Sequence, residues 1–183
     1  VTSLYPLENT SREWYLERVG RIRKSMPDCA ITTDIIAGFC GETLQDHQDT
    51  LDIIRKVGYD YAYMFQYSER PGTLAARNYP DDIPLQEKTR RLNEIIELQN
   101  GLSLESNRRD VGKRFKVLVE GTSRRSQDEL CGRTSMNKMC VFPAKLASDG
   151  VPADGVNVLK IGDYVEVEVR SCTSATLICD IVK

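Results

Sequence analysis

The sequence contains a single histidine, His47, and none of its six cysteines has a second cysteine three positions away. Structural zinc sites need closely spaced Cys and His ligands, and disulfide frameworks belong mainly to short, cysteine-dense secreted chains. The cysteines here stand mostly in apolar segments, where free thiols behave as small hydrophobic side chains. We therefore predict no metal ligand in this chain, and we interpret His47 as a surface or packing residue.

Long apolar runs are also missing. No stretch of about 18 apolar residues is available to span a bilayer, and the N-terminus lacks a basic segment followed by an apolar core, which would mark an exported protein. We expect no membrane partner and a cytoplasmic location. With 183 residues, of which 40% are hydrophobic and 28% charged, the composition is typical of one or two small globular domains.

The net charge of -2 is unevenly distributed along the chain. Residues 108–145 contain 10 Lys and Arg against 4 Asp and Glu, so this segment carries +6 within an acidic protein. Such a cluster of cations matches the electrostatic pattern of a protein that binds a phosphate backbone. A solvated basic face has the same composition, so charge alone leaves both interpretations open.

The N-terminal part of the sequence alternates between helical and strand-like patterns. Thr10 and Glu13 form a capping-box signature, and apolar residues then recur at helical spacing, which predicts a helix over residues 11–26. Residues 29–39 form an apolar, β-branched run of strand length. This pattern predicts a strand that is buried on both faces of a parallel sheet.

A helix over residues 43–58 and a strand over residues 59–68 follow, which completes a strand–helix–strand unit with parallel strands. In the second strand, Tyr61, Tyr63 and Phe65 alternate along one side. We expect these three rings to fill the core, because the interior of such a sheet needs bulky side chains.

Each of the two predicted strands ends in a turn that contains glycine: GFCGET at residues 38–43 and SERPGT at residues 68–73. Loops at the C-terminal ends of parallel strands gather on one face, so we expect these turns to be neighbours and to form a ligand site. Gly38 and Gly41 would let the backbone approach a ligand, and the helix after Thr43 offers free N–H groups. A purely structural role remains an equal alternative for each turn.

The C-terminal part has a different pattern. A Pro- and Asp-rich connection at residues 78–84 leads to a long helical pattern that ends near Asn107. Five short strand patterns follow, which predicts a small antiparallel barrel of the oligonucleotide-binding (OB) kind. We expect an α/β domain over residues 1–110 and an all-β domain over residues 111–183, with a mobile loop at residues 144–160.

Four segments carry a family resemblance: TTDIIAGFCGET, YDYAYMFQYSERPGTLAA, RLNEIIELQN and CGRTSMNKMCVFP. In this order they resemble the C-terminal half of the radical S-adenosylmethionine (SAM) methylthiotransferases, over nearly the whole chain from about Arg12 to Lys183. The combination of YSERPGT with GRTSMNK resembles the tRNA-modifying branch more than the branch that acts on a ribosomal protein. Cys40 replaces the proline of the usual GFPGET turn.

The resemblance implies an architecture in three parts: an N-terminal domain with an auxiliary iron–sulfur cluster, a radical-SAM partial (βα) barrel, and an RNA-binding TRAM domain. This chain would comprise the C-terminal part of the partial barrel and the TRAM domain. The C-x-x-x-C-x-x-C motif that holds the radical-SAM cluster is absent from the sequence. The resemblance therefore implies a fragment, inactive alone, whose two [4Fe–4S] clusters are bound by a missing N-terminal half of the same protein; the leading residues VTSLYPLEN depart from the family.

The function that the resemblance implies is tRNA modification by radical-SAM chemistry: methylthiolation of C2 of N6-isopentenyladenosine at position 37, with SAM as cofactor and the tRNA anticodon stem-loop as partner. Two alternatives remain, namely a methylthiotransferase that acts on a ribosomal protein and a stand-alone RNA-binding fragment without catalysis.

The resemblance also places sites on this sequence, without assigning a catalytic residue. The implied SAM-binding residues are Asp34, Ile36, Gly38, Gly41, Glu42, Tyr67 and Ser68. The predicted RNA-binding residues are Arg70, Lys113, Arg114, Lys116, Arg124, Arg125, Arg133, Asn137 and Lys138. Among these, Arg124 with Arg125 and Arg133 with Lys138 are the preferred contacts, because turns present charges outward together.

Overall fold

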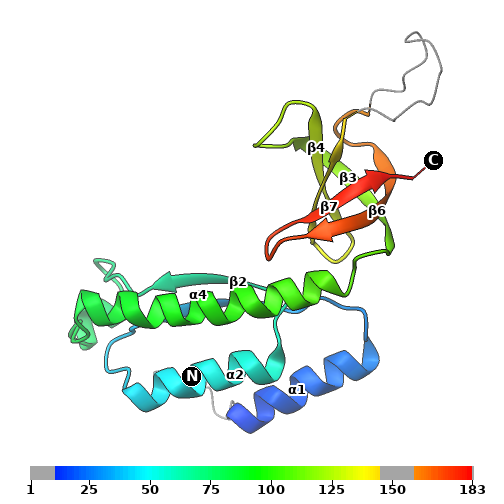
Figure 1. Cartoon of the computed structure of the whole chain (residues 1–183). Helices are drawn as coiled ribbons and strands as arrows, with labels where there is room; N and C mark the ends of the chain where they lie inside the picture. Colours follow the sequence, from blue (N-terminus) through cyan, green and yellow to red (C-terminus); the bar gives the residue numbers. More distant parts are fainter. Residues whose placement is uncertain (1–10, 145–158, 183) are drawn as a thin grey trace, which may run out of the picture. The chain divides into compact units, whose positions relative to one another are not determined.

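The structure, a computed structural model, describes residues 11–144 and 159–182 (Figure 1). By its internal contacts the chain divides into a first unit, Val1–Leu102, and a second unit, Ser103–Lys183. The predicted loop at residues 144–160 and the leading residues VTSLYPLEN lie almost entirely outside the described part. The described elements of the first unit are α1 (Arg12–Ser25), β1 (Thr32–Ala37), α2 (Leu44–Val57), β2 (Tyr61–Gln66), α3 (Leu74–Asn78) and α4 (Leu85–Arg108), whose last turns belong to the second unit.

The helix caps follow from residues close to them in the sequence. Helix α2 begins with a complete capping box, in which Thr43 accepts from the Asp46 amide and Asp46 accepts from the Thr43 amide. Gly58 is its C-cap, as predicted. The predicted start of α1 was wrong by one position: the N-cap is Ser11, whose side chain accepts from the Trp14 amide, and Thr10 lies outside the described residues.

Strands β1 and β2 pair in parallel, from Thr32 beside Tyr61 to Ala37 beside Gln66. One face of this sheet packs on helices, since Ala62 is buried and Ala37 belongs to the core that also contains Ile54 of α2 and Ile95 of α4. This confirms the strand–helix–strand unit. The longest helix, α4, is too polar to cross a bilayer, and no other helix of the described residues is long and apolar enough either.

The other face of the sheet is exposed, which corrects two predictions. Strand β1 is not buried on both faces, because Ile36 has 55% of its surface exposed. Tyr61, Tyr63 and Phe65 do not fill the core either: they are 45%, 53% and 54% exposed. The physical reason is that helices cover only one side of this sheet in the described part of the chain, whereas alternating apolar residues occupy both sides.

The second unit contains a closed barrel of five strands in the order β3-β4-β5-β7-β6. The OB-like barrel is therefore confirmed in strand number, but a fully antiparallel barrel was wrong, because β5 and β7 pair in parallel. A ring of five strands cannot alternate in direction all the way round, so at least one neighbouring pair must be parallel. The strands are β3 (Arg114–Thr122), β4 (Glu129–Thr134), β5 (Met139–Pro143), β6 (Tyr164–Cys172) and β7 (Leu177–Ile181).

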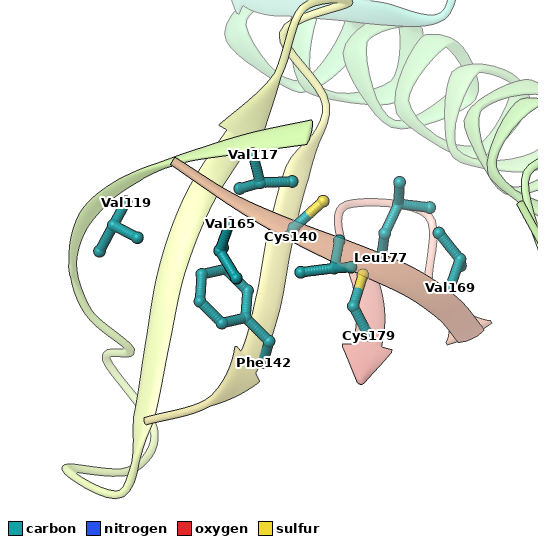
Figure 2. Packing of buried hydrophobic residues seen from close by; sticks show 9 residues of the cluster. Val117, Val119, Cys140, Phe142, Val165, Val169, Leu177 and Cys179 are labelled. Atoms are coloured by element: carbon teal, nitrogen blue, oxygen red, sulfur yellow. The ribbon is translucent and has the colours of Figure 1, made fainter. Parts of the chain in front are cut away.

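The barrel interior is filled by alternate residues of its strands, as Figure 2 shows. Val117 and Val119 point inward from β3, and Phe142 packs with them from β5. Gly132 of β4 has no space for a side chain: an added Cβ would collide with the Leu118 carbonyl group and lie 2.7 Å from Val117 Cγ1. Close packing of this kind makes the barrel sensitive to added volume at that position.

Candidate functional site

The two predicted turns meet at the C-terminal ends of β1 and β2. The Tyr67 amide donates to the Ala37 carbonyl oxygen at 2.8 Å, directly after the last paired residues of the sheet. The rings of Phe39 and Tyr67 then contact edge to face, with centroids 4.7 Å apart. The prediction that the two turns are spatial neighbours is confirmed.

Gly38 is required by the backbone and by its neighbours. Its φ of 72° lies in the left-handed region, and a Cβ there would come within 2.5 Å of Lys88 Cγ. Its amide donates to Glu42 Oε2 at 2.9 Å. These contacts give Gly38 a structural role in closing the turn, in addition to the predicted role of letting a ligand approach.

Arg91 of α4 anchors the turn after β1. Its side chain is 5% exposed, and Nη1 donates to Glu42 Oε1 at 2.7 Å and to the Glu42 carbonyl oxygen at 2.8 Å. Glu87 accepts from Arg91 Nε at 2.8 Å. Burial alone lowers the pKa of Arg91, but the hydrogen bonds and charges of Glu87 and Glu42 outweigh it and raise that pKa. The guanidinium therefore stays charged and holds the turn by charge-assisted hydrogen bonds.

Lys88, one helical turn earlier, anchors the other loop. Its buried ammonium contacts Asp81 Oδ1 at 2.5 Å, lies 3.4 Å from the Tyr67 carbonyl oxygen, and sits 5.1 Å from the centroid of the Tyr67 ring. Neither Lys88 nor Arg91 was predicted from the sequence. A signal was present, because Lys88 precedes Leu92 by four positions and Arg91 precedes Ile95 by four positions, so each lies on the face of the helix that carries apolar residues.

His47 is fully buried, with 1% of its surface exposed, and pairs with Glu94 through an Nε2–Oε2 contact of 2.5 Å. The hydrogen bond from His47, together with nearby Arg90, lowers the pKa of Glu94. This supports the interpretation of His47 as a packing residue, and no group of three or more metal-ligating side chains occurs within the described ranges.

A cavity of about 380 Å³ borders this region. Its walls include β1 at Asp34 and Ile36, the turn at Cys40 and Glu42, and α2 at Thr50. Asp34 and Ile36 project from the exposed side of the sheet, where the register places them beside Tyr63 and Phe65. A ligand in this part of the first unit could therefore contact a carboxylate, an apolar side chain and aromatic rings.

The predicted SAM-binding residues all lie at or near these strand ends, but not all of them have free side chains. Both carboxylate oxygens of Glu42 are used, by Arg91 and by the Gly38 amide. Tyr67 is half-buried, and its hydroxyl oxygen is buried without a hydrogen-bond partner among the described residues. Burial, followed by the neighbouring Cys40 thiol, raises the pKa of Tyr67. Ser68 is exposed beside it.

The predicted RNA-binding residues belong to both units of the chain. Arg70 is exposed in the first unit, whereas the other eight belong to the second. Arg124 and Arg125 lie in the loop between β3 and β4 and border a shallow hollow formed by Thr122–Gln127. No ion pair joins either arginine to a carboxylate of the described residues.

Four of the remaining cations are engaged with neighbours. Lys113 pairs with Asp110 and Arg114 with Glu168, while both keep more than half of their side-chain surface exposed. Arg133 contacts Glu120 at 3.3 Å and donates to the Asn137 carbonyl oxygen at 3.1 Å, in a turn where Asn137 has a φ of 60°. Lys116 extends over the Tyr164 ring, 4.8 Å from its centroid.

Lys138 is not presented to a partner. Its side chain is 11% exposed, and its ammonium contacts Asp110 Oδ2 at 2.6 Å and Ser106 Oγ at 2.9 Å. The same ammonium also donates to the Ser106 carbonyl oxygen. These bonds tie the end of α4 to the barrel within the second unit. The prediction that Lys138 points outward to contact RNA is therefore not supported by its position.

Two of the four cysteines in the barrel strands, Cys140 and Cys179, belong to the hydrophobic core. Cys140 and Cys179 are both buried, with 0% and 1% of their surface exposed. A hydrogen bond with Cys179, followed by burial, raises the pKa of Cys140. Because both thiols are buried among apolar side chains, they fit the interpretation of these two cysteines as core residues.

The chain is similar to known proteins in both of its units. The TRAM domain family matches residues 108–182. The chain is similar to tRNA-2-methylthio-N(6)-dimethylallyladenosine synthases: it is 54% identical to that of Phocaeicola vulgatus over 167 residues, 91% of this chain and 34% of the relative. The same synthase from Porphyromonas gingivalis is 46% identical over 173 residues, 94% of this chain and 35% of the relative, and that of Amoebophilus asiaticus is 49% identical over 172 residues, 93% and 33%.

The chain thus spans about a third of the length of the curated relatives that it matches. The agreement extends across both units and includes the TRAM domain. These matches identify the chain as homologous to the C-terminal region of the tRNA-2-methylthio-N(6)-dimethylallyladenosine synthases.

Proposed function

We propose that this chain is the C-terminal part of an enzyme that methylthiolates tRNA at C2 of N6-isopentenyladenosine, position 37, by radical-SAM chemistry. The observation that carries the proposal is the 46–54% identity to synthases named for this product, which extends over both units of the chain. The TRAM domain supports it further, since the cluster of cations in residues 108–145 suits a nucleic-acid substrate.

The exposed side of β1 and β2 supports the finer fold proposal. It carries Ile36, Tyr63 and Phe65, large side chains that a folded sheet normally covers. In a partial (βα) barrel this side would face the interior, while α2 and α4 would form the outer layer. We therefore propose that the first unit is the last part of a radical-SAM barrel, whose remaining strands belong to the other two thirds of the protein.

The residues at the strand ends fit SAM. Asp34 and Ile36 line the cavity, a Cβ added at Gly41 would meet no atom within 4 Å, and the buried Tyr67 hydroxyl has no partner among the described residues. When bound, SAM would supply the radical that removes a hydrogen atom and the methyl group that is transferred. Ser68 would add a hydroxyl beside Tyr67.

The protein's own contribution here is positioning. Arg91 and Lys88 hold the two loops at the ends of the strands, so that the groups facing SAM are preorganised before it binds. Glu42 acts through the backbone of Gly38 and makes no direct bond to the cofactor in this proposal. The apolar side chains around Ile36 would exclude water from the radical chemistry.

The described residues do not fit an iron–sulfur cluster. No three His, Cys, Asp or Glu side chains within them converge on a point, and the sequence lacks the C-x-x-x-C-x-x-C motif. We propose that both [4Fe–4S] clusters are bound by the part of the protein that precedes this chain. No step of the reaction is assigned to cluster ligands here.

For tRNA, we propose that the anticodon stem-loop contacts the loop at Arg124 and Arg125, with Lys113, Arg114 and Arg133 as further cations of the same unit. Phosphate contacts of this type give most of the affinity and make it dependent on salt. Arg70, in the loop after β2, would contact the substrate from the first unit.

The experiment that tests this function uses the gene that encodes the chain, in its full length. It is expressed in a bacterial strain whose own tRNA methylthiotransferase has been deleted, and the nucleosides of the purified tRNA are analysed by mass spectrometry. We expect the 2-methylthio derivative of N6-isopentenyladenosine to reappear. The 183-residue chain alone serves as control and is expected to produce none.

The alternatives have distinct outcomes in the same experiment. A methylthio group on a ribosomal protein, with none in tRNA, would contradict the proposed substrate and favour the other branch of the family. Product in neither, combined with retained RNA binding by the 183-residue chain, would indicate a binding module.

A further inference from the structure

We propose that Tyr164 is a base-stacking site on the outside of the barrel, which binds an unpaired nucleotide of the RNA. This inference rests on the proposed RNA-binding function and adds to it a residue that the sequence analysis did not select. It concerns the side of the barrel formed by β3 and β6, where Tyr164 pairs in register with Leu118.

Tyr164 is the only aromatic side chain of this unit that can meet a base. Residues 103–183 contain three aromatic residues: Phe115, Phe142 and Tyr164. Phe142 is buried and Phe115 packs against the same core. Tyr164 is 62% exposed. Proteins that bind single-stranded nucleic acid combine cations with exposed rings on which bases stack, so an aromatic stacking contact from this barrel must use Tyr164.

The surroundings of Tyr164 suit a nucleotide. Lys116 Nζ lies 4.8 Å from the centroid of the ring, and Lys116 makes no ion pair with the carboxylates that the structure describes. Its ammonium is therefore available to a phosphate next to the stacked base. Lys160, four positions before Tyr164, is exposed in the same connection.

An apolar strip continues from the ring across the outer surface. The strand register places Leu118 of β3 beside Tyr164 of β6 on one side and beside Arg133 of β4 on the other. Arg133 in turn pairs in register with Met139 of β5. This row therefore offers apolar contacts to a base and also contains the Arg133 guanidinium. Its members are Tyr164, Leu118, Arg133 and Met139. Guanidinium and aromatic planes are both surfaces on which unstacked RNA bases pack.

Hydrogen bonds hold the backbone beneath the ring, so little conformational entropy would be lost when a base stacks on Tyr164. The turn before β6 is bonded to β3 twice: the Gly162 amide donates to the Val119 carbonyl oxygen at 2.9 Å, and the Val119 amide donates to the Asp163 carbonyl oxygen at 2.9 Å. Ile161 in this turn is 73% exposed. Together, Ile161 and Tyr164 are the most exposed large hydrophobic side chains of the described barrel.

The test measures binding of the 183-residue chain to RNA that contains one 2-aminopurine, whose fluorescence falls when it stacks. The probes are a single-stranded RNA and a fully paired duplex that carries the same labelled strand. We expect the chain to quench the single strand. Tyr164→Leu should abolish the quenching and weaken binding of the single strand about 5- to 100-fold, while binding of the duplex stays unchanged.

Tyr164→Phe is the matched control, because it keeps the ring and should retain both quenching and affinity. Circular dichroism verifies that each variant keeps its barrel. Equal affinity and quenching for Tyr164→Leu and the unchanged chain would overturn the stacking site while leaving RNA binding intact. The site is also refuted if the substitution weakens duplex and single strand alike. No binding of either RNA by the unchanged chain would contradict the RNA-binding function itself, and the inference with it.

Discussion

Replacing Arg91 with methionine should destabilise the first unit strongly, because this arginine is buried in an ion pair. Arg91 and Glu42 have side-chain exposures of 5% and 12%, and two hydrogen bonds join them. Methionine has a similar length and keeps most of the packing, but it leaves the Glu42 carboxylate with the Gly38 amide as its remaining partner. Removing one member of a buried pair costs about 3–5 kcal/mol.

We expect a loss near the lower end, about 3 kcal/mol, since Glu42 keeps that amide bond and slight exposure. With an m-value of about 1.5 kcal/mol/M, the urea midpoint falls by about 2 M. The assay is urea unfolding followed by the fluorescence of Trp14, the single tryptophan, which lies in α1 and so reports on the first unit.

Arg90→Met is the matched control. It removes the same charge from the neighbouring position, but Arg90 is 44% exposed and pairs with Glu87 and Glu94 on the helix surface. Exposed pairs contribute at most about 1 kcal/mol, so its midpoint should fall much less than that of the Arg91 variant. Equal midpoints for the Arg91 and Arg90 variants would refute the conclusion that Arg91 anchors the turn. A double variant with Glu42→Gln should lose less than the sum of the two single changes, because the residues are coupled.

Two further predictions concern pH and barrel packing. Hydrogen bonds, chiefly from Arg90, lower the pKa of Glu87 from 4.5 to about 2, so its charged form stabilises the fold above pH 4.5. The urea midpoint of the first unit should therefore fall as the pH drops from 4.5 towards 2. Glu87→Gln should reduce this dependence of the midpoint on pH. An unchanged dependence in the variant would be inconsistent with the pairing. In the barrel, Gly132→Ala should cost about 1–3 kcal/mol in thermal unfolding because the new methyl group meets the Leu118 carbonyl group. Gly121→Ala, with no atom within 4 Å of the new methyl group, is its control, and similar melting temperatures for both variants would contradict the steric argument.

Several features could be predicted because neighbours in the sequence decide them. Thr43 and Asp46 form a capping box from residues three positions apart, and helix α2 begins there. The meeting of the loops after β1 and β2 follows from parallel pairing, which a strand–helix–strand pattern predicts. The barrel strands were recognisable by alternation, and closure of five strands requires at least one parallel pair, although closure alone does not identify it as β5 and β7.

The sequence alone specifies the strand–helix–strand unit, the five strands of the barrel and the resemblance to the tRNA-modifying family, but it gave no sign of the short helix α3. Which side chains are covered depends on the assembled fold: Tyr63 alternates as a core residue would, yet it is exposed, whereas Arg91 is buried against Glu42 and Lys138 is only 11% exposed beside Asp110. The physical reason is that periodicity is a property of one segment, but burial depends on what packs against it from elsewhere in the chain. Pairs such as Lys138 and Asp110, 28 positions apart, form only when the strands and helices are assembled.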